Sequence, residues 1–466
     1  MQELGVGLVY WPALAPLFES GDAAVLELEP QTLWKKTSTA LGFAYQLNDQ
    51  LFESIVSLSQ AKLLHGVGQP VAGTVDDPTE YVPLLRRMAS GLDPAWISEH
   101  LSFSRVRHGE QVTECGFLLP PAQTPATVRV AARNLRRYAA DVGYAVAFET
   151  GVNYLAPVDG HLDDGRFFAE VAELADCGIL LDLHNLSCNE RNGRQRALDA
   201  ISQMPLERVW EVHVAGGEPL DGLWLDAHSG GMSPELIELA ATVIPRLPNV
   251  GALIFEVLPE HLDRIGLDGV QRQLEQLRSV WSRRSGRQVR VERAKRDDAA
   301  PTLSDEREAS AWERRLISAL NGGALDDPLA ADRGCVVLKR LIHDARSASL
   351  ARGLRFTTTA LLAGLGKDAV ARLLSDYFQS SPPETFVVME CYRFARFLKN
   401  RSDLVSSVAY LAEILAFEHA LLAASLFGTT TVVHWTVDPT ELIAALETGK
   451  MPGQLPRSPS RMTITA

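Results

Sequence analysis

Cysteine is scarce in this chain. Its five cysteines, Cys115, Cys177, Cys188, Cys335 and Cys391, are scattered through 466 residues, are odd in number and form no Cys-x-x-Cys pair. This spacing argues against a disulfide framework and against a zinc site built from thiolates.

Long apolar runs and an excess of basic residues are also missing. No run of about 18 apolar residues occurs, and Met1-Gln2-Glu3-Leu4 does not open a secretory signal. The formal net charge is -13, whereas nucleic acids and anionic membranes require a basic face. We therefore expect a cytoplasmic protein with no nucleic-acid partner and no membrane partner.

Nucleotide-binding signatures are absent as well. No Gly-x-Gly-x-x-Gly follows a first strand and no P-loop occurs, so no nucleotide cofactor is expected. Ser98 and Ser102 flank the pair Glu99-His100, but no nucleophile elbow surrounds either serine.

The composition is that of a folded protein with more than one domain. Hydrophobic residues make up 46% of the chain and charged residues 22%, which is typical of globular proteins with a full core. A length of 466 residues predicts two domains as the starting count.

Eight short apolar runs recur in the first half of the chain, each followed by a helical stretch or a loop. They are residues 5–10, 24–30, 63–71, 95–103, 144–151, 178–185, 208–216 and 251–259. Residues 127–143 show the helical spacing of three and four. Apolar strands that alternate with helices predict a parallel sheet covered by helices. Eight units favour a TIM-type (β/α)8 barrel over residues 1–280, with an open doubly wound sheet as the alternative.

The second half of the chain has a different character. Residues 281–308 are rich in charge and poor in apolar residues, which predicts a linker. From 309 to 453 the pattern predicts a mostly α-helical domain, and residues 454–466 are expected to be a disordered tail. The candidate helices are residues 312–320, 336–350, 357–374, 386–399 and 406–426.

Ionisable side chains stand at nearly every predicted strand end. In such barrels the strand ends and the following loops build the active site. The candidates are Glu29, His65, Glu99, His100, Glu149, Asp182, His184, Glu211, His213, Asp226, His228 and Glu256. Burying so many carboxylates and imidazoles together is costly unless cations organise them, so we expect a metal site.

The donor types narrow the choice of metal. Imidazole and carboxylate without thiolate suit iron, manganese or zinc, and more than four candidate ligands indicate two or three ions with bridging carboxylates. Glu211 either faces the same interior as His213 or orients that imidazole from behind. Zinc-dependent hydrolysis and metal-dependent isomerisation fit these donors equally well.

Several strings resemble the multinuclear non-heme iron-dependent oxidases that modify ribosomally made peptides, a family that includes the methanobactin-forming oxidase. They occur in the family's order over about residues 5 to 270. The strings are Leu64-His65-Gly66-Val67, Ser98-Glu99-His100-Leu101-Ser102, Phe148-Glu149-Thr150 with Asn153-Tyr154, Leu181-Asp182-Leu183-His184-Asn185, Glu211-Val212-His213-Val214-Ala215-Gly216, Asp226-Ala227-His228 and Ile254-Phe255-Glu256.

The resemblance implies a TIM-type barrel that holds two or three irons of mixed Fe2+/Fe3+ valence and uses O2 as co-substrate. It makes His65, His100, Glu149, Asp182, His213, Asp226, His228 and Glu256 the implied metal ligands. The expected catalytic residues are Glu149 and Asp182, which are placed to bridge metals, and His184. The implied reaction oxidises a side chain, most often cysteine in this family, on a precursor peptide.

The chain departs from the family at three places. His184 stands where the family usually has an amide, Ser229 follows His228 where an acidic residue is common, and residues 115–121 differ from the family's usual Asp-Leu-Leu-Pro-Leu-Pro string. These departures leave the metal core intact but bear on the substrate and the number of metals.

The C-terminal half resembles the separate partner protein of these oxidases at residues 391–398 and 408–418. That likeness implies a fused module that binds the peptide leader, so that a separate partner protein is unnecessary. The alternative is a helical domain that only packs on the barrel. Two other functions compete with the oxidase: a divalent-metal sugar isomerase or endonuclease of the xylose-isomerase type, and a metal- or peptide-binding chaperone.

Overall fold

The computed structural model describes residues 1–39, 42–75, 81–286, 288–291, 300–323, 327–384 and 386–465, without the side chains of 36–43. Contacts group the described chain into two compact units. Unit 1 comprises residues 1–34, 47–113 and 117–339, and unit 2 comprises residues 35–46, 114–116 and 340–466.

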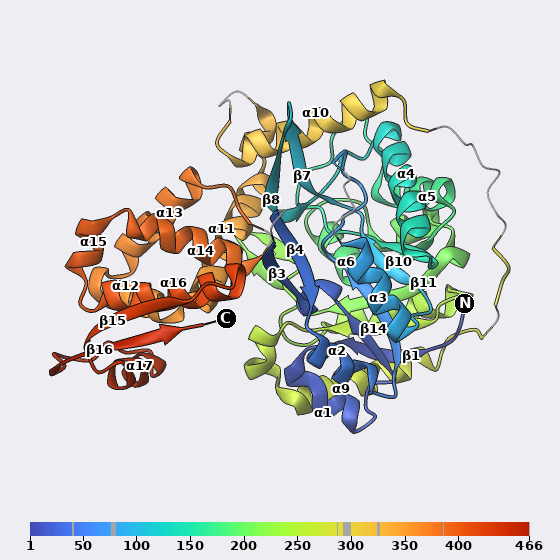
Figure 1. Cartoon of the computed structure of the whole chain (residues 1–466). Coiled ribbons are helices and arrows are strands. Elements are labelled where there is room, and N and C mark those ends of the chain that lie inside the picture. The colour runs from blue at the N-terminus through green and yellow to red at the C-terminus, as the bar shows by residue number, and fades with distance from the viewer. Residues whose placement is uncertain are drawn as a thin grey trace. The chain divides into compact units, whose positions relative to one another are not determined.

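Unit 1 is built on a closed barrel of eight parallel strands (Figure 1). The strand order is β1-β14-β11-β10-β9-β6-β5-β2, and β2 pairs with β1 to close the ring. The strands are β1 (Gly5–Val9), β2 (Val25–Leu28), β5 (Ala61–Gly66), β6 (Ile97–His100), β9 (Val146–Glu149), β10 (Gly178–Asp182), β11 (Val209–Ala215) and β14 (Ala252–Glu256). Seven of the strands lie within predicted runs, and β5 begins two residues before its run at 63–71, so the predicted barrel is confirmed and the open sheet is excluded.

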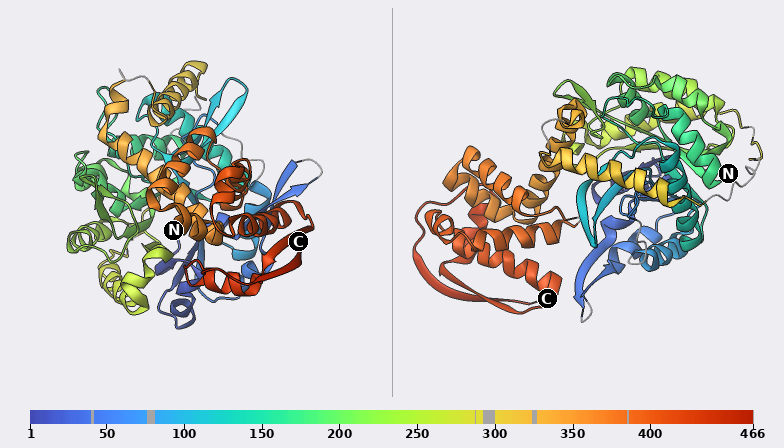
Figure 2. Two further views of the ribbon diagram at one scale, coloured as in Figure 1. Left: turned by 90° about the vertical axis from the view of Figure 1, so that its left-hand side faces the viewer. Right: turned by 90° about the horizontal axis from the view of Figure 1, so that it is seen from above.

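Helices surround the strands because parallel strands need long crossovers and are buried on both faces (Figure 1, Figure 2). They are α1 (Ala15–Glu19), α2 (Asp49–Val56), α3 (Val82–Leu92), α4 (Pro125–Val142), α5 (Asp164–Ala175), α6 (Leu183–Arg191), α7 (Ala197–Gln203), α8 (Pro234–Val243) and α9 (Leu262–Trp281). The predicted helix at 127–143 corresponds to α4, which begins after the N-cap Thr124 and ends before Gly143 at φ +78°.

The two-residue periodicity of the strands decides which side chains enter the barrel. One buried apolar cluster contains Val9, Val25, Leu63, Trp96, Ala147, Ala252 and Ile254. The polar residues two or four positions further along the same strands include Glu27, His65, His100, Glu149 and Glu256. The apolar cluster and the ionisable strand ends therefore lie on the same, interior face of the strands.

Three two-stranded hairpins lie in the segments that connect the barrel strands. They are β3 (Trp34–Thr39) with β4 (Gly42–Leu47), β7 (Phe103–His108) with β8 (Gln111–Leu119), and β12 (Glu218–Leu220) with β13 (Leu223–Leu225). The last of these hairpins ends one residue before Asp226 and so leads directly into the loop of Asp226 and His228.

Helix α10 (Leu303–Leu320) packs against α4 and β7 within unit 1. The prediction of a linker is wrong for residues 303–308, because Thr302 and Asp305 form a capping box that starts the helix there. Arg129 of α4 forms an ion pair with the same Asp305. Residues 287 and 292–299 of the predicted linker lie outside the described residues.

Unit 2 is mostly helical, as predicted, around a core that includes Leu361, Tyr377, Phe394 and Leu415. Its elements are the later part of α11 (Arg333–Gly353), α12 (Arg355–Leu365), α13 (Lys367–Ser380), α14 (Val387–Lys399), α15 (Ser402–Ser407), α16 (Leu411–Phe427), β15 (Thr431–Val437), α17 (Pro439–Glu447) and β16 (Arg457–Ile464). The predicted helix at 357–374 is divided at Gly366, whose φ is +79°.

The predicted disordered tail is wrong for residues 457–464. These residues form β16, which pairs antiparallel with β15, and Figure 2 shows the two strands side by side. The sequence did not predict this hairpin, because β16 is exposed along most of its length and so lacks the apolar run by which a buried strand is recognised. Among the residues that the structure describes, none of the helices combines the length and apolarity that a membrane crossing requires.

Glu313 of α10 gives unit 1 a testable dependence on pH. Its carboxylate is buried and accepts the backbone N–H and the hydroxyl of Thr74, while burial raises its pKa from 4.5 to about 7. The folded state therefore holds this proton more tightly than the unfolded state, so the free energy of unfolding should fall as pH rises from about 4.5 to about 7.

The variant Glu313→Gln should lose that part of the pH dependence, at most about 3 kcal/mol, as measured by chemical denaturation of the full chain. The exposed Glu308→Gln on the same helix should keep the wild-type profile. Identical profiles for wild type and Glu313→Gln would contradict the assignment.

Candidate metal centre

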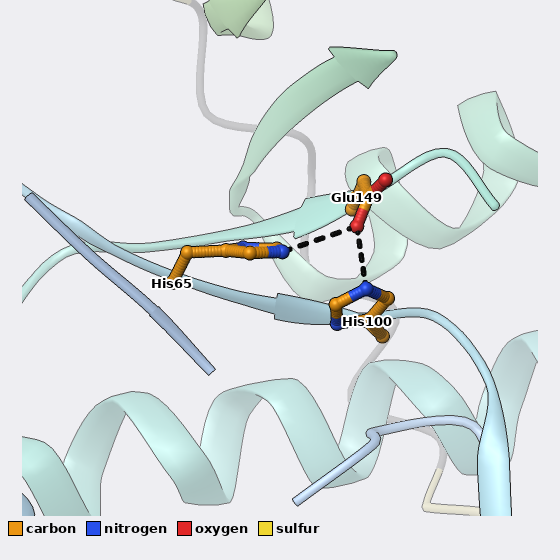
Figure 3. Close-up of side chains that lie close together, drawn as sticks. All are labelled: His65, His100 and Glu149. Atoms are coloured by element: carbon orange, nitrogen blue, oxygen red, sulfur yellow. Dashed lines mark ion pairs between the residues drawn. The ribbon is translucent and has the colours of Figure 1, made fainter. Parts of the chain in front are cut away.

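Two imidazoles and a carboxylate meet at the mouth of the barrel (Figure 3). His65 comes from β5, His100 from the end of β6 and Glu149 from the end of β9. Glu149 Oε2 lies 3.2 Å from His65 Nε2 and 2.9 Å from His100 Nε2. Three groups that stand far apart in the sequence thus converge within the reach of one ion.

Each of these three side chains is oriented by a further contact. His65 Nδ1 lies 2.8 Å from Ser98 Oγ, and His100 Nδ1 lies 2.9 Å from the carbonyl oxygen of Gly66. The amide of Asn185 donates to Glu149 Oε1 at 2.9 Å. Partners of this kind fix the ring orientation of metal-binding histidines and leave the other nitrogen free for the ion.

A second set of donors comes from β11, β14 and the loop after β13. His228 Nε2 lies 2.9 Å from Asp226 Oδ1 and 3.2 Å from Glu256 Oε2. His213 Nδ1 lies 3.3 Å from Glu256 Oε1. His228 holds φ at +48°, a conformation that non-glycine residues adopt rarely and that is often found at functional sites.

Asp182 connects the two sets. It ends β10, is fully buried, and caps α6 by accepting the backbone N–H of Asn185 at 2.8 Å. One donor atom each from Asp182, Glu149 and His213 lie within 4.8 Å of one another. Glu149 therefore belongs to two donor groups at once.

Not every candidate from the sequence joins these groups. Glu99 accepts the backbone N–H groups of Gln69 and His100, so its carboxylate faces the loop after β5 and the end of β6. Glu29 lines the cavity above the donors. His184 Nε2 lies 3.6 Å from Asp226 Oδ1 and 3.5 Å from Cys188 Sγ.

Glu27 is a site residue that the sequence reasoning missed. It lies inside β2 rather than at its end, and its Oε2 is 3.1 Å from His213 Nε2. Glu211 also faces this nitrogen, at 3.6 Å. The available signal was an acidic residue at the centre of an apolar strand, since such a residue is rarely buried without a partner.

The carboxylates of the site control the charge of its imidazoles. Burial alone would lower the pKa of His100, His213 and His228, but the adjacent carboxylates raise all three pKa values well above the ordinary value. For His100 the principal carboxylate is Glu149. Protons therefore supply the positive charge that these carboxylates require when no metal ion does.

The carboxylates respond in opposite ways. Burial opposes the ionisation of Glu149 and Glu256, yet neighbouring imidazoles hold the pKa of Glu149 well below its usual range and lower that of Glu256 to about 2. Burial, followed by the charges of Glu149, Asp226 and Glu256, raises the pKa of Asp182 well above its usual range. Asp182 thus lacks sufficient compensating positive charge.

Unpartnered polar atoms mark the same places. Asp182 Oδ2 is buried without a hydrogen-bond partner, and Glu149 Oε2, His213 Nδ1 and Asp226 Oδ1 are buried with only the ion-pair contacts given above. A buried oxygen or nitrogen in this state is costly, and a cation among these atoms would satisfy all of them. The donor set of imidazoles and carboxylates fits iron, manganese or zinc.

A cavity of about 250 Å³ opens over the donors. Its outer wall is largely apolar and includes Phe117, Leu119, Pro120, Phe168 and Leu258. Among the described residues that line it, none is a lysine or an arginine. A bound molecule would therefore contact metal-binding groups at the floor of the cavity and uncharged side chains along its wall.

Comparison with known proteins assigns the chain to a family. The family profile described as RiPP precursor modification enzyme MbnB/TglH/ChrH matches residues 46–258, which contain all eight implied metal ligands. A UPF0276 protein from Caulobacter sp. (strain K31) is 30% identical over 213 residues, which cover 43% of this chain and 75% of that protein. The chain belongs to this family.

Other relatives agree over a shorter length. UPF0276 proteins from Anaeromyxobacter sp. (strain Fw109-5) and Chromobacterium violaceum are 30% and 29% identical over 192 and 184 residues. These alignments cover 41% and 40% of this chain and 66% and 65% of the two relatives, so the chain spans just under two thirds of their length.

Solved structures resemble the barrel only loosely. A D-allulose 3-epimerase from Methylomonas sp. has a TM-score of 0.38 at 15% identity, covering 60% of this chain and 99% of its own. An L-ribulose 3-epimerase has a TM-score of 0.32 at 14% identity, covering 70% and 100%.

The imidazole pKa values predict how this cluster takes up metal. Metal binding needs neutral imidazole, and His100, His213 and His228 hold their protons to a higher pH than ordinary histidines. Binding of Mn2+ to the full chain at pH 7 should therefore release protons, and the affinity should fall as pH is lowered.

Calorimetry in two buffers of different ionisation enthalpy measures this proton release. The variant His108→Ala, which changes an exposed histidine on the β7–β8 hairpin, should behave as wild type. Equal binding enthalpies in both buffers would contradict the prediction.

Proposed function

We propose that this protein is a multinuclear iron-dependent oxidase that uses O2 to modify a side chain, expected to be cysteine, of a ribosomally synthesised precursor peptide. The observation that carries the proposal is the convergence of imidazoles and carboxylates with buried unpartnered atoms, within the segment that matches the family. Family membership supplies the class of substrate.

The distances between the donor atoms indicate which of the implied ligands would share one ion. His65, His100 and Glu149 would hold one iron, and Asp182, His213 and Glu256 would hold a second that shares Glu149. Asp226 and His228 offer donors for a third, beside which His184 adds an imidazole. Glu149, Asp182 and His184 remain the proposed catalytic residues.

When bound, the irons would supply the redox chemistry that passes electrons from the substrate to O2. The protein's own residues prepare the space around that chemistry. The apolar wall at Phe117, Leu119 and Phe168 excludes water from the substrate side chain, which strengthens every electrostatic interaction at the cavity floor. The backbone N–H of Asp226 donates to the Tyr154 hydroxyl at 3.0 Å, which fixes the loop that carries Asp226 and His228.

The family match favours a peptide-modifying enzyme over a sugar isomerase, and the cavity lining does not favour an endonuclease. An enzyme that acts on nucleic acid would place cationic side chains against the phosphates, and none of the described lining residues is a lysine or an arginine. A peptide segment with an uncharged side chain fits this wall better.

The C-terminal region completes the proposal. Unit 2 would bind the leader part of the precursor peptide, so that the chain carries catalyst and recognition module together and needs no separate partner protein. The support is the likeness of residues 391–398 and 408–418 to the partner protein, and both segments contribute to the unit 2 core. A cytoplasmic location stays a prediction.

The oxidase proposal predicts a dependence on oxygen. The iron-loaded chain should change the mass of a short cysteine-containing peptide encoded beside its gene when air is present. Under argon the mass should not change, because no electron acceptor is supplied. The same mass change in the absence of oxygen would refute the oxidase.

The variant Glu149→Gln should reduce the reaction at least about 100-fold and lower the iron content, because it removes the charge between two imidazoles. The exposed Glu53→Gln on α2 should retain both.

Elemental analysis tests the metal independently of the peptide. Protein produced in iron-rich medium should contain two or three irons per chain. Protein that contains zinc and no iron, and that is active in that form, would favour the isomerase or endonuclease instead.

A further inference from the structure

Two carboxylates lie behind the proposed ligand His213, inside the barrel. Glu27 belongs to β2 and Glu211 to β11, two residues before His213 on the same face of that strand. All three side chains are 0% exposed. Glu27 lies outside the segment matched by the family profile, which begins at residue 46.

The ring of His213 is held between this carboxylate pair and the metal centre. Its Nε2 lies 3.1 Å from Glu27 Oε2 and 3.6 Å from Glu211 Oε1. Its other nitrogen, Nδ1, lies 3.3 Å from Glu256 and has no hydrogen-bond partner. With Nε2–H donated to the carboxylates, the lone pair of the neutral ring is on Nδ1.

The pair is itself fixed in place. Trp96 Nε1 donates to Glu211 Oε2 at 2.7 Å, while Glu27 Oε2 and Glu211 Oε1 both face Nε2 of His213. Burying two acids completely is unfavourable unless they are paired in this way. A barrel that needed only a packed interior would fill these positions with apolar side chains, as it does at Val25 and Leu63 on the layer beneath.

We propose that Glu27 and Glu211 are positioning residues that hold His213 with Nε2–H turned into the barrel and Nδ1 presented to a metal ion. This inference rests on the proposed function, because it takes His213 as a ligand. It adds a residue from β2 to a centre whose proposed ligands come from β5 onwards.

The same three side chains could instead hold an ion of their own, since their donor atoms lie within 4.8 Å of one another. The existing contacts favour the positioning role. One oxygen of Glu211 already accepts the Trp96 N–H, and an ion between the three side chains would displace the Nε2–H of His213 from Glu27.

The experiment titrates the chelator-treated full chain with Co2+ and records the affinity and the ligand-field spectrum. Glu27→Met and Glu211→Met remove the acceptor at similar volume, while Glu27→Gln keeps an amide oxygen that can accept from Nε2–H. Glu313→Gln, which changes a buried carboxylate of unit 1 outside the barrel interior, is the matched control.

The Met variants should bind one Co2+ equivalent about 10- to 100-fold more weakly, with a changed spectrum. Glu27→Gln should restore most of the affinity, and Glu313→Gln should match wild type. The thermal midpoint of the metal-free Met variants should fall, because one partner of a buried pair has been removed, and the loss of Co2+ affinity should exceed what this fall accounts for.

Three results would overturn the inference. The first is wild-type affinity and spectrum in both Met variants. The second is the loss of one whole Co2+ equivalent with the others unchanged, which would make the pair an ion site. The third is weaker binding only in proportion to a lowered thermal midpoint of the metal-free protein. Failure of wild type to bind Co2+ would instead remove the proposed function, on which this inference depends.

Discussion

Carboxylates and imidazoles share a largely buried space at the barrel mouth, and the balance of charge among them constrains the rest of unit 1. Glu149, Asp182, Asp226 and Glu256 are buried or nearly so, and each would be unstable there as an isolated anion. The imidazoles neutralise part of this charge by holding protons. Because protons and metal ions compete for the same lone pairs, the metal-free and metal-bound states differ in protonation as well as in occupancy.

The fold meets this constraint by supporting each donor from behind. The packing around Gly66 is tight, because a Cβ at this position would lie 2.3 Å from Glu99 Oε2. The carbonyl oxygen of Gly66 also lies 2.9 Å from His100 Nδ1. Glu99 itself is occupied by the backbone of Gln69 and His100. A charged residue next to a proposed ligand in the sequence can thus accept backbone N–H groups instead of binding the metal. These hydrogen bonds hold the backbone around the donors in place.

His184 adds a further imidazole beside Asp226, at the side of the donor cluster. Its Nε2 lies 3.6 Å from Asp226 Oδ1 and 3.5 Å from the Sγ of Cys188. Burial raises the pKa of that thiol well above its usual range, so Cys188 packs as a neutral group next to the imidazole. His184 therefore lies beside Asp226 at one side of the donor cluster, apart from the group formed by His65, His100 and Glu149.

The amino-acid sequence by itself determined the eight strands and most of the donors, because parallel barrel strands are continuous apolar runs and their ends are where ionisable groups stand out. Local sequence patterns failed to predict an element wherever its structure depends on a contact with a distant segment of the chain. The hairpin β15–β16 and the start of α10 were missed in that way. Only the tertiary structure decided that Glu99 faces backbone and Glu27 faces His213, since both depend on which strands become neighbours around the ring. Side-chain direction alternates along a strand, but its contact partner is set by the closure of the barrel.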